Sequence, residues 1–468
     1  MNALQRDLKK MVARVERADA PRAAADPARQ RYHIMPPIGW LNDPNGLCKV
    51  GDTYHVFYQY GPFDVNGGVK HWGHATSTDL AHWQPQPPML YPDEPFDCHG
   101  AYSGSALYDE GVLYLYYTGN VKHPGNFDYI KAGRGHNTCL ATSRDGVTAD
   151  TKQCLMTNAD YPADLSCHVR DPKVFAFDGR WYMVQGARTL ADKGEVLVFV
   201  SDDKLHWRHC NTITTPEPFG YMWECPDLFR LNGQWFLAVS PQGAPSQNVY
   251  ACGYFPLYGD WRGECTLGKF REFDWGFDFY APQSFEDGSR RLQLAWMGMP
   301  DAPYDNAPTV RCGWQHCLSV PCELTARGDR LLRNPAPELA ALRGAGELFA
   351  IVPGAVWHGT ACDLQCEILD PQTPFALTLR GGLELKFADG MLTLAFADSK
   401  IAAGRTVRKA EIGALHDVRV LMDESSAEIF VNGGETVLST RFYPAPNAVG
   451  LYFTAGCGRA VVYEMHKG

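Results

Sequence analysis

Three carboxylic acids occupy matching places in three widely separated stretches of the sequence. Asp43, Asp171 and Glu224 each precede, by eight or nine residues, a glycine that opens an aromatic-rich segment. Asp43 lies among turn-forming residues, Asp171 follows Arg170, and Glu224 has apolar neighbours, so their surroundings differ. A single Asp-Pro is most often a turn, but three acids at equivalent places favour a shared function. Pairs of carboxyl groups in unlike environments are what hydrolysis of a glycosidic bond requires.

The segments that carry these acids belong to a repeat, and the repeat predicts the fold. A polar turn containing glycine is followed five times by an aromatic-rich stretch, at intervals of 54 to 68 residues. A hairpin turn and strand recurring at such a period is typical of β-propeller blades, whose first strands line a central channel. We therefore predict a five-bladed β-propeller in which the three acids meet at one end of the channel. The five turns contain Gly51, Gly111, Gly179, Gly233 and Gly288.

The rest of the chain divides into further parts. In residues 1–30, apolar side chains recur at helical spacing among basic ones, which predicts an N-terminal helical extension on the surface. We assign residues 31–323 to the propeller and residues 324–340, with their run Asn-Pro-Ala-Pro, to an irregular linker. Short alternating apolar runs then predict a β-sandwich domain over residues 341–468. The expected fold class is all-β: a five-bladed propeller followed by a C-terminal sandwich, with a short N-terminal helix.

Composition excludes several classes of protein. The 468 residues are 45% hydrophobic and 21% charged, with a net charge of −10, so we expect no nucleic-acid partner. The sequence has neither an apolar signal core nor a run of 18 apolar residues, and we expect no membrane segment. The fifteen cysteines include no Cys-x-x-Cys pair, which favours reduced thiols and a cytoplasmic location.

The first acidic motif carries the clearest resemblance to a known family. Residues 31–46 read Arg-Tyr-His-Ile-Met-Pro-Pro-Ile-Gly-Trp-Leu-Asn-Asp-Pro-Asn-Gly and resemble the opening of glycoside hydrolase family 32. This family contains invertases, sucrose-6-phosphate hydrolases and fructan hydrolases. Residues 170–172 (Arg-Asp-Pro) and 224–226 (Glu-Cys-Pro) resemble its other two signature motifs, and further matches extend over residues 31–340 and, more weakly, 428–430. The resemblance implies a five-bladed propeller followed by a sandwich, in agreement with the repeat.

The resemblance also implies a role for each acid. Asp43 is similar to the nucleophile that attacks the anomeric carbon of a β-fructofuranosyl unit. Glu224 is similar to the acid that protonates the departing oxygen and then activates water, and Asp171 resembles the transition-state stabiliser that holds fructose hydroxyls. The implied reaction retains the anomeric configuration through a covalent fructosyl-enzyme and uses neither a metal nor an organic cofactor.

The sugar-binding residues implied by the resemblance come from the same motifs. Some would donate hydrogen bonds and others would form aromatic walls, although packing between blades is the alternative for Tyr280 and Trp296. The set is Trp40, Leu41, Asn42, Gln59, Trp72, Tyr102, Ser103, Arg170, Tyr280 and Trp296.

Two positions depart from the family pattern. Gly61 stands where the family usually has asparagine, and Gly67 where it commonly has tryptophan. Losing that indole removes a large apolar wall beside the fructose pocket. These departures do not change the roles expected for the three acids, but they make the substrate preference harder to predict from the sequence.

Several functions stay open on the sequence alone. A cytoplasmic β-fructofuranosidase acting on sucrose or sucrose 6-phosphate is the main interpretation. The alternatives are a short-fructan hydrolase or fructosyltransferase, a non-catalytic sugar-binding propeller, and an inverting arabinan-cleaving enzyme. The expected partner is a small sugar, and the protein is expected to be a monomer or a homodimer. A phosphate subsite would need basic residues, and a glycine-rich loop that we interpret as solvated surface offers Lys122, His123, Lys131, Arg134 and His136.

Overall fold

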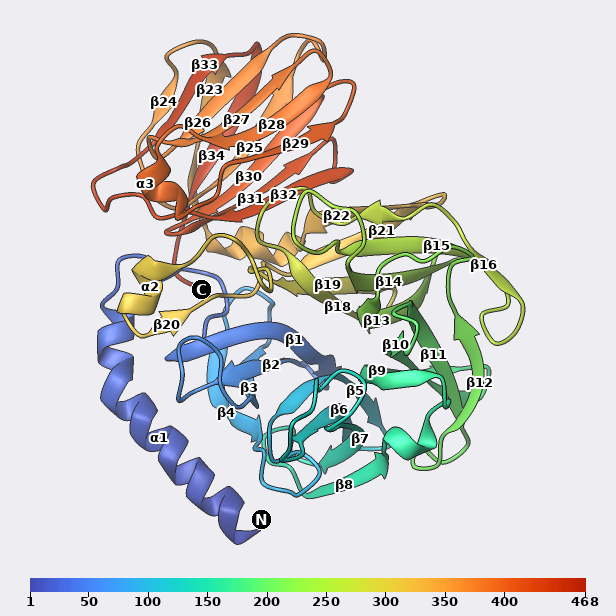
Figure 1. Cartoon of the computed structure of the whole chain (residues 1–468). Coiled ribbons are helices and arrows are strands. Elements are labelled where there is room, and N and C mark those ends of the chain that lie inside the picture. Colours follow the sequence, from blue (N-terminus) through green and yellow to red (C-terminus); the bar gives the residue numbers. More distant parts are fainter.

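Almost all regular structure in this protein is β. The computed structural model describes all 468 residues, and its strands form seven sheets. Five sheets come from residues 39–335 and two from residues 343–465. Figure 1 shows the first five grouped in chain order, from blue to yellow, with the two later sheets in orange and red beside them. The expected all-β class with an N-terminal helix is confirmed.

Each of the first five sheets is built mainly from four antiparallel strands. The first contains β1 (Gly39–Val50), β2 (Thr53–Gly61), β3 (His71–Ser77), β4 (Gln84–Leu90) and the short β20 (Trp314–Gln315), which is parallel to β1. The second contains β5 (Ala101–Asp109), β6 (Val112–Lys122), β7 (Arg134–Ser143) and β8 (Thr151–Met156). The third contains β9 (Leu165–Phe177), β10 (Arg180–Thr189), β11 (Gly194–Ser201) and β12 (Arg208–Ile213). The fourth contains β13 (Met222–Leu231), β14 (Gln234–Gln242), β15 (Gly253–Gly259), β16 (Cys265–Leu267) and β17 (Arg271–Glu272). The fifth contains β18 (Tyr280–Asp287), β19 (Arg290–Trp296), β21 (Cys322–Arg327) and β22 (Arg330–Pro335).

A tight turn at one of the five predicted glycines joins the first and second strands of every one of these sheets. Gly111 between β5 and β6 has φ +79°, and Gly179 between β9 and β10 has φ +74°. Residues other than glycine rarely adopt a positive φ, which explains why glycine recurs at these turns. The predicted repeat is thus a series of hairpins, and each of the three acids lies on the first strand of its hairpin.

The first strands of the five sheets form a closed ring. β1 contacts β5, β5 contacts β9, β9 contacts β13, β13 contacts β18, and β18 contacts β1 again. The strand β20 reinforces the closure, because the chain leaves the fifth sheet after β19, pairs with β1 and returns as β21. We call β1, β5, β9, β13 and β18 the ring strands.

A β-bulge interrupts every ring strand. The interruptions include Asp43, Ser103, Asp171, Cys225 and Ala281, and all of these except Ser103 are followed by proline. Proline has no N–H to donate, so inside a sheet it is confined to edges and bulges. A bulge redirects a side chain out of the regular alternation, and every ring strand has at least one such interruption.

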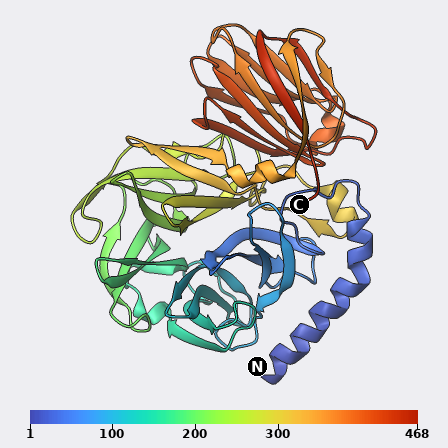
Figure 2. The same cartoon turned by 180° about the vertical axis from the view of Figure 1, so that it is seen from behind.

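Two six-stranded sheets form the C-terminal part and enclose a common apolar core (Figure 2). One sheet contains, in order, β23 (Arg343–Ile351), β34 (Gly458–Met465), β25 (Cys362–Ile368), β30 (Asp417–Asp423), β31 (Ser426–Val431) and β32 (Thr436–Arg441). The other contains β24 (Val356–Trp357), β33 (Leu451–Ala455), β26 (Phe375–Leu379), β27 (Leu383–Ala388), β28 (Met391–Phe396) and β29 (Val407–Glu411).

The linker predicted over residues 324–340 is wrong for most of its length. β21 and β22 occupy residues 322–335 and complete the fifth sheet as a hairpin, with Gly328 in the turn at φ +60°. The connection to the C-terminal sheets is therefore short and consists mainly of the 3₁₀ helix η2 (Pro337–Leu342). The prolines that suggested irregular structure mark the end of the hairpin.

The N-terminal helix α1 (Ala3–Ala24) lies along the outside of the ring of sheets, beside the first one (Figures 1 and 2). Asn2 caps it by accepting a hydrogen bond from the amide of Gln5 (2.8 Å). The hydroxyl of Tyr60 on β2 donates to Glu16 of the helix at 2.9 Å. None of the helices combines the length and apolar character needed to span a bilayer. The remaining ones are η1 (Asn158–Asp160), α2 (Ala307–Arg311) and α3 (Ser399–Ala402).

A buried histidine anchors the segment that leads into β1. His33 contacts Asp423 (Nδ1 to Oδ2, 2.7 Å) and Glu428 (Nε2 to Oε1, 3.0 Å), and all three side chains are fully buried. Burial alone would lower the pKa of His33, but its hydrogen bonds to the two carboxylates outweigh burial and raise the pKa to about 10. A charged histidine thus ties the chain ahead of Asp43 to the C-terminal sheets.

Replacing this histidine should destabilise the protein strongly. His33→Ala leaves two buried carboxylates without their counter-charge, a change that costs about 3–5 kcal/mol in proteins. His82→Ala is the matched control, because His82 makes a similar contact with Asp79 (2.7 Å) at a solvent-exposed place, where an ion pair contributes at most about 1 kcal/mol. Urea unfolding at pH 7 measures both losses, and equal losses would contradict the anchoring role of His33.

Candidate active site

The three acids come together at one cavity of about 350 Å³. Asp43 reaches it from β1, Asp171 from β9 and Glu224 from β13. Seven of the ten predicted sugar-binding residues line the same cavity: Trp40, Asn42, Gln59, Tyr102, Arg170, Tyr280 and Trp296. Residues more than two hundred positions apart thus converge at the bulges of the ring strands, as the spacing of the repeat predicts.

Uncharged donors hold the carboxylate of Asp43. Ser103 Oγ donates to its Oδ2 (2.6 Å), Gln59 Nε2 to the same oxygen (3.2 Å), and Asn42 Nδ2 to Oδ1 (3.0 Å). Burial raises the pKa of Asp43 above its usual value, while the hydrogen bonds from Ser103 and Asn42 work against that rise. The donors fix the orientation of a group that, when ionised, can act as a nucleophile.

The carboxylate of Glu224 has polar neighbours, in contrast to its apolar sequence context. Arg170 Nη2 donates to Oε1 at 2.6 Å, and the hydroxyl of Tyr280 donates to Oε2 at 2.6 Å. The adjacent Trp223 is fully buried and stacks on Phe255, with the ring centroids 5.5 Å apart. The apolar neighbour Trp223 therefore packs away from the cavity, whereas the Glu224 carboxylate contacts polar side chains of two other sheets.

Asp171 combines an unusual backbone with a buried carboxyl group. Its φ is +64°, directly before a proline, a strained conformation of the kind found at functional sites. Its Oδ2 accepts a hydrogen bond from the amide of Cys225 (2.9 Å), and Arg170 Nε lies 3.9 Å from the same oxygen. Burial raises the pKa of Asp171 to about 7, although the charge of Arg170 opposes the rise.

This arrangement suits nucleophilic and acid–base chemistry on a polar substrate. Asp43 is held by uncharged donors, whereas Glu224 is held by a guanidinium and a phenol. Unlike surroundings allow two carboxyl groups to take different roles, one as nucleophile and one as proton donor. Asp171 and Arg170 lie beside both and supply an acceptor and donors for hydroxyl groups.

Aromatic rings form one side of the cavity. The ring of Trp40 lies 5.8 Å from that of Trp296 and 4.5 Å from that of His316, and Tyr280 lies 6.4 Å from Trp296. Tyr280 and Trp296, for which packing between blades was the alternative, belong to this wall and line the cavity. Flat apolar faces beside hydrogen-bonding groups are suited to a sugar ring.

Three residues of the predicted sugar-binding set do not line the cavity. Leu41 is fully buried in the apolar core, because side chains alternate along a strand and its neighbours Trp40 and Asn42 take the cavity side. Trp72 is also fully buried, and its indole N–H donates to the carbonyl oxygen of Tyr102 (3.0 Å). Ser103 lies behind Asp43 and acts on it through its hydroxyl. Leu41 belongs to the apolar cluster that also contains Tyr280 and Trp296, whereas Trp72 belongs to a separate one.

The cavity also contains residues that sequence reasoning missed or misplaced. The glycine-rich loop was expected to be solvated surface, yet Arg134 and His136 at its end line the cavity, while Lys122, His123 and Lys131 are exposed. Arg134 and His136 lie at the start of β7. Predicting a strand here could have indicated that their side chains face the cavity. No sequence signal indicated the others, which are Lys70, Gln242, Met299, Pro300 and Asp301.

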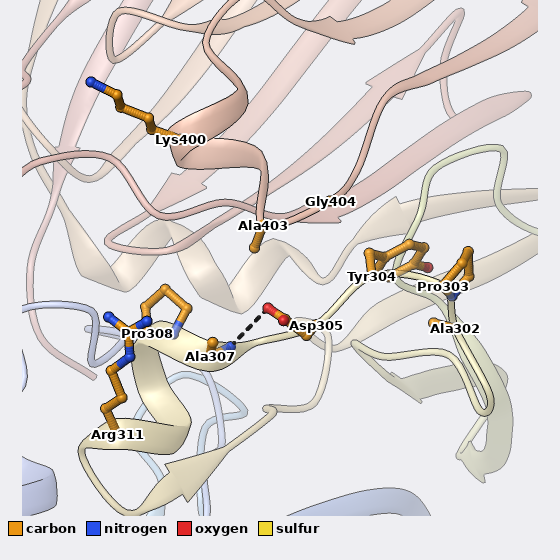
Figure 3. A pocket seen from close by; sticks show the side chains of 10 residues that line it. All are labelled: Ala302, Pro303, Tyr304, Asp305, Ala307, Pro308, Arg311, Lys400, Ala403 and Gly404. Atoms are coloured by element: carbon orange, nitrogen blue, oxygen red, sulfur yellow. Dashed lines mark hydrogen bonds between the residues drawn. The ribbon is translucent and has the colours of Figure 1, made fainter.

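A larger cavity, about 640 Å³, lies between the loop after β19 and the C-terminal sheets (Figure 3). Its only acidic side chain, Asp305, accepts a hydrogen bond from the amide of Ala307 (3.1 Å), and Lys400 on α3 points away from the other residues. None of the predicted catalytic or sugar-binding residues lines it. The short run from Met299 to Asp301 separates it from the cavity with the three acids.

Comparisons with known proteins agree with this site. The chain matches the glycosyl hydrolases family 32 N-terminal domain over residues 33–335 and the family 32 C-terminal domain over residues 388–466. A sucrose-6-phosphate hydrolase from Bacillus subtilis (strain 168) is 40% identical over 95% of each chain. The structure of a sucrose-6-phosphate hydrolase from Lactobacillus gasseri has a TM-score of 0.88 and 28% identity, covering 97% of this chain and 96% of that one. A mutant of a GH32 beta-fructofuranosidase from Bombyx mori, in complex with sucrose, has a TM-score of 0.84 and 28% identity, covering 100% and 99%.

The fold, the three converging acids and these matches define a glycoside hydrolase. The chain belongs to glycosyl hydrolase family 32.

Removing the hydroxyl of Tyr280 should slow turnover, because this hydroxyl orients Glu224. A hydrogen bond to a charged group contributes about 1.5–3 kcal/mol, so Tyr280→Phe should lower kcat by about 10- to 100-fold with little change in KM. Tyr54→Phe is the matched control, since the Tyr54 hydroxyl also donates to a carboxylate, that of Asp287 (2.8 Å), away from the cavity. Steady-state kinetics of glycoside hydrolysis compares the two, and equal effects would argue against an orienting role.

Proposed function

We propose that this protein is a retaining β-fructofuranosidase that hydrolyses the terminal β-D-fructofuranosyl bond of sucrose or sucrose 6-phosphate. The observation that carries the proposal is the convergence of Asp43, Asp171 and Glu224 at one cavity, with Asp43 and Glu224 in unlike surroundings. The relatives support the substrate class, because two of them are named sucrose-6-phosphate hydrolases and the third is a fructofuranosidase in complex with sucrose.

The reaction then consists of two displacements at one carbon. An oxygen of Asp43 attacks the anomeric carbon of the fructosyl unit while Glu224 gives its proton to the departing oxygen, so the departing sugar leaves with a hydroxyl group and a fructosyl ester of Asp43 remains. Glu224 next takes a proton from water, the water oxygen attacks the same carbon, and the bond to Asp43 breaks. Asp171 and Arg170 hold the fructose hydroxyls in both steps. Two inversions give net retention.

For the fold, we propose that the five successive sheets are the blades of a five-bladed β-propeller. The closed ring of first strands and the repeated hairpins support this assignment. Because β22 completes the fifth sheet, we place the catalytic domain at residues 31–335, preceded by the helical extension of residues 1–30. The sandwich domain then occupies residues 341–468.

For the compartment, we propose the cytoplasm. The fifteen cysteines are free thiols, as expected of a reducing compartment. A phosphotransferase system delivers its sugar to the cytoplasm already phosphorylated, and sucrose 6-phosphate is the substrate in the names of the two bacterial relatives.

Removing either working carboxylate should abolish turnover without unfolding the protein. Asp43→Ala and Glu224→Gln should each lower kcat on sucrose and sucrose 6-phosphate by about 10³-fold or more, because a covalent step or its proton transfer is lost. Glu195→Gln is the control: Glu195 is another buried acid, and burial raises its pKa to about 7, but it lies on β11 outside the cavity. Circular dichroism verifies folding, and near-normal activity in Asp43→Ala or Glu224→Gln would refute the mechanism.

The stereochemistry of the released fructose tests the covalent intermediate separately. Retention requires that fructose first leave the enzyme as its β-anomer, because Asp43 and water attack opposite faces of the carbon in turn. NMR of freshly formed product, recorded before mutarotation, should show that anomer. Initial release of the inverted anomer would exclude a nucleophilic Asp43.

A further inference from the structure

Lys70 is a basic residue that lines the catalytic cavity. Its ammonium lies 4.7 Å from the centre of the Trp40 ring and has no hydrogen-bond or ion-pair partner in the protein. Two other basic residues line the cavity: Arg170 is paired with Glu224 at 2.6 Å, and Arg134 contacts His136 at 3.2 Å. Because a charge withdrawn from water is costly unless it is partnered, an unpaired ammonium here indicates a ligand that brings negative charge.

The turn between β2 and β3 is shaped so that this ammonium reaches the cavity. A Cβ on Gly61 would overlap the carbonyl oxygen of Gly67, so the turn can approach β2 closely only with glycine at position 61. Gly67 has φ +132°, and a Cβ there would lie 3.3 Å from Lys70 Nζ. The ammonium thus stands in the space that a side chain at position 67 would enter. Both glycines that depart from the family pattern thus belong to the turn that brings Lys70 to the cavity.

The remaining polar groups of the cavity already provide for an uncharged sugar. Asn42, Gln59 and Arg170 offer hydrogen-bond donors, and Asp171 offers an acceptor, all near the nucleophile. Binding an uncharged sugar therefore does not require the positive charge of Lys70. A phosphate monoester carries a charge of about −2 near neutral pH and three strong acceptor oxygens, which match an ammonium with three free N–H groups.

We propose that Lys70 binds the phosphate group of phosphorylated sucrose and makes the enzyme prefer the phosphorylated sugar to the free one. This inference rests on the proposed function and assigns a specificity-determining residue within it. Arg134 is the rival basic group in the cavity: its Nη1 is engaged by His136 Nε2 at 3.2 Å, whereas its Nε is buried without a hydrogen-bond partner. The proposal commits to Lys70.

The test compares kcat/KM for sucrose 6-phosphate and for sucrose in three variants. Lys70→Met removes the charge while keeping the length of the side chain, and should lower kcat/KM for sucrose 6-phosphate by about 10- to 100-fold, the range of a charge-assisted hydrogen bond. For sucrose, which brings no charge to Lys70, the loss should be several times smaller. Lys122→Met is the matched control, because Lys122 is exposed beside Tyr129 outside the cavity, and should match the wild type on both substrates. Arg134→Gln tests the rival.

Each alternative outcome of these kinetic measurements would contradict a specific claim. Equal losses of Lys70→Met on both substrates would mean that Lys70 acts on the nucleophile or the fold, and no loss would mean that it binds nothing. Loss of the preference in Arg134→Gln but not in Lys70→Met would assign the phosphate to Arg134. A wild-type enzyme that prefers sucrose would refute the inference alone, whereas one that hydrolyses neither sugar would refute the proposed function itself.

The pH dependence gives an independent readout. Burial lowers the pKa of Lys70 to about 7, with Asp43 and Asp64 partly opposing the shift. Burial also lowers the pKa of His71 to about 4 and that of His316 well below its usual value, so neither histidine changes charge above pH 7. Asp171, whose pKa burial raises to about 7, titrates in the same range, but its proposed contacts are with the fructosyl unit that both sugars share, so its titration affects both rates. The preference for sucrose 6-phosphate should therefore fall between pH 7 and pH 9 in the wild type, as the free ammonium loses its proton. Lys70→Arg should retain the preference across this range, because a guanidinium stays charged; parallel profiles would contradict the proposal.

Discussion

Mutual repulsion between carboxyl groups in one cavity of about 350 Å³ is the constraint to which the rest of the structure responds. Each group loses hydration when it is buried and raises the free energy of ionising the next. Two features offset this repulsion. Arg170 lies against Glu224 and near Asp171, and uncharged donors surround Asp43. These compensations differ from one acid to the next, so the carboxyl groups of Asp43 and Glu224 lie in unlike electrostatic surroundings.

The strained ring strands are the means by which the acids meet. Asp171, Cys225 and Ala281 all have positive φ values directly before a proline, at the bulges of β9, β13 and β18. Such conformations cost about 1–3 kcal/mol each and persist only where the surroundings hold them. Closure of the ring, with β18 against β1, supplies that restraint, since no ring strand can relax without displacing two neighbours.

The sequence predicted the features that depend on local residue types and spacing, and few of those that depend on tertiary packing. The three acids precede their glycine turns by eight or nine residues, and aromatic strands follow the turns, so the hairpins and the convergence of the acids could be predicted from spacing. Side chains that enter the cavity from connecting loops were beyond this reasoning. Lys70 and Asp301 reach it from such loops, because tertiary packing decides where a loop lies. The hairpin of β21 and β22 was missed for a related reason: its alternation is real, but the prolines that end it were taken for irregular chain.

The C-terminal sheets hold in place the segments that enter two of the ring strands, β1 and β18. The amides of Trp275 and Phe277 donate to the carbonyl oxygens of Val437 and Ser439 (both 2.8 Å), so the segment entering β18 is fixed along β32. Three residues after Phe277, Tyr280 meets Glu224. On the other side of the cavity, His33 ties the segment entering β1, and so Asp43, to Asp423 and Glu428. Asp43 and Tyr280 are thus both preceded by chain anchored in the same sheet. Their relative position therefore depends on contacts between the two domains, which explains how these sheets can matter for the reaction without touching the sugar.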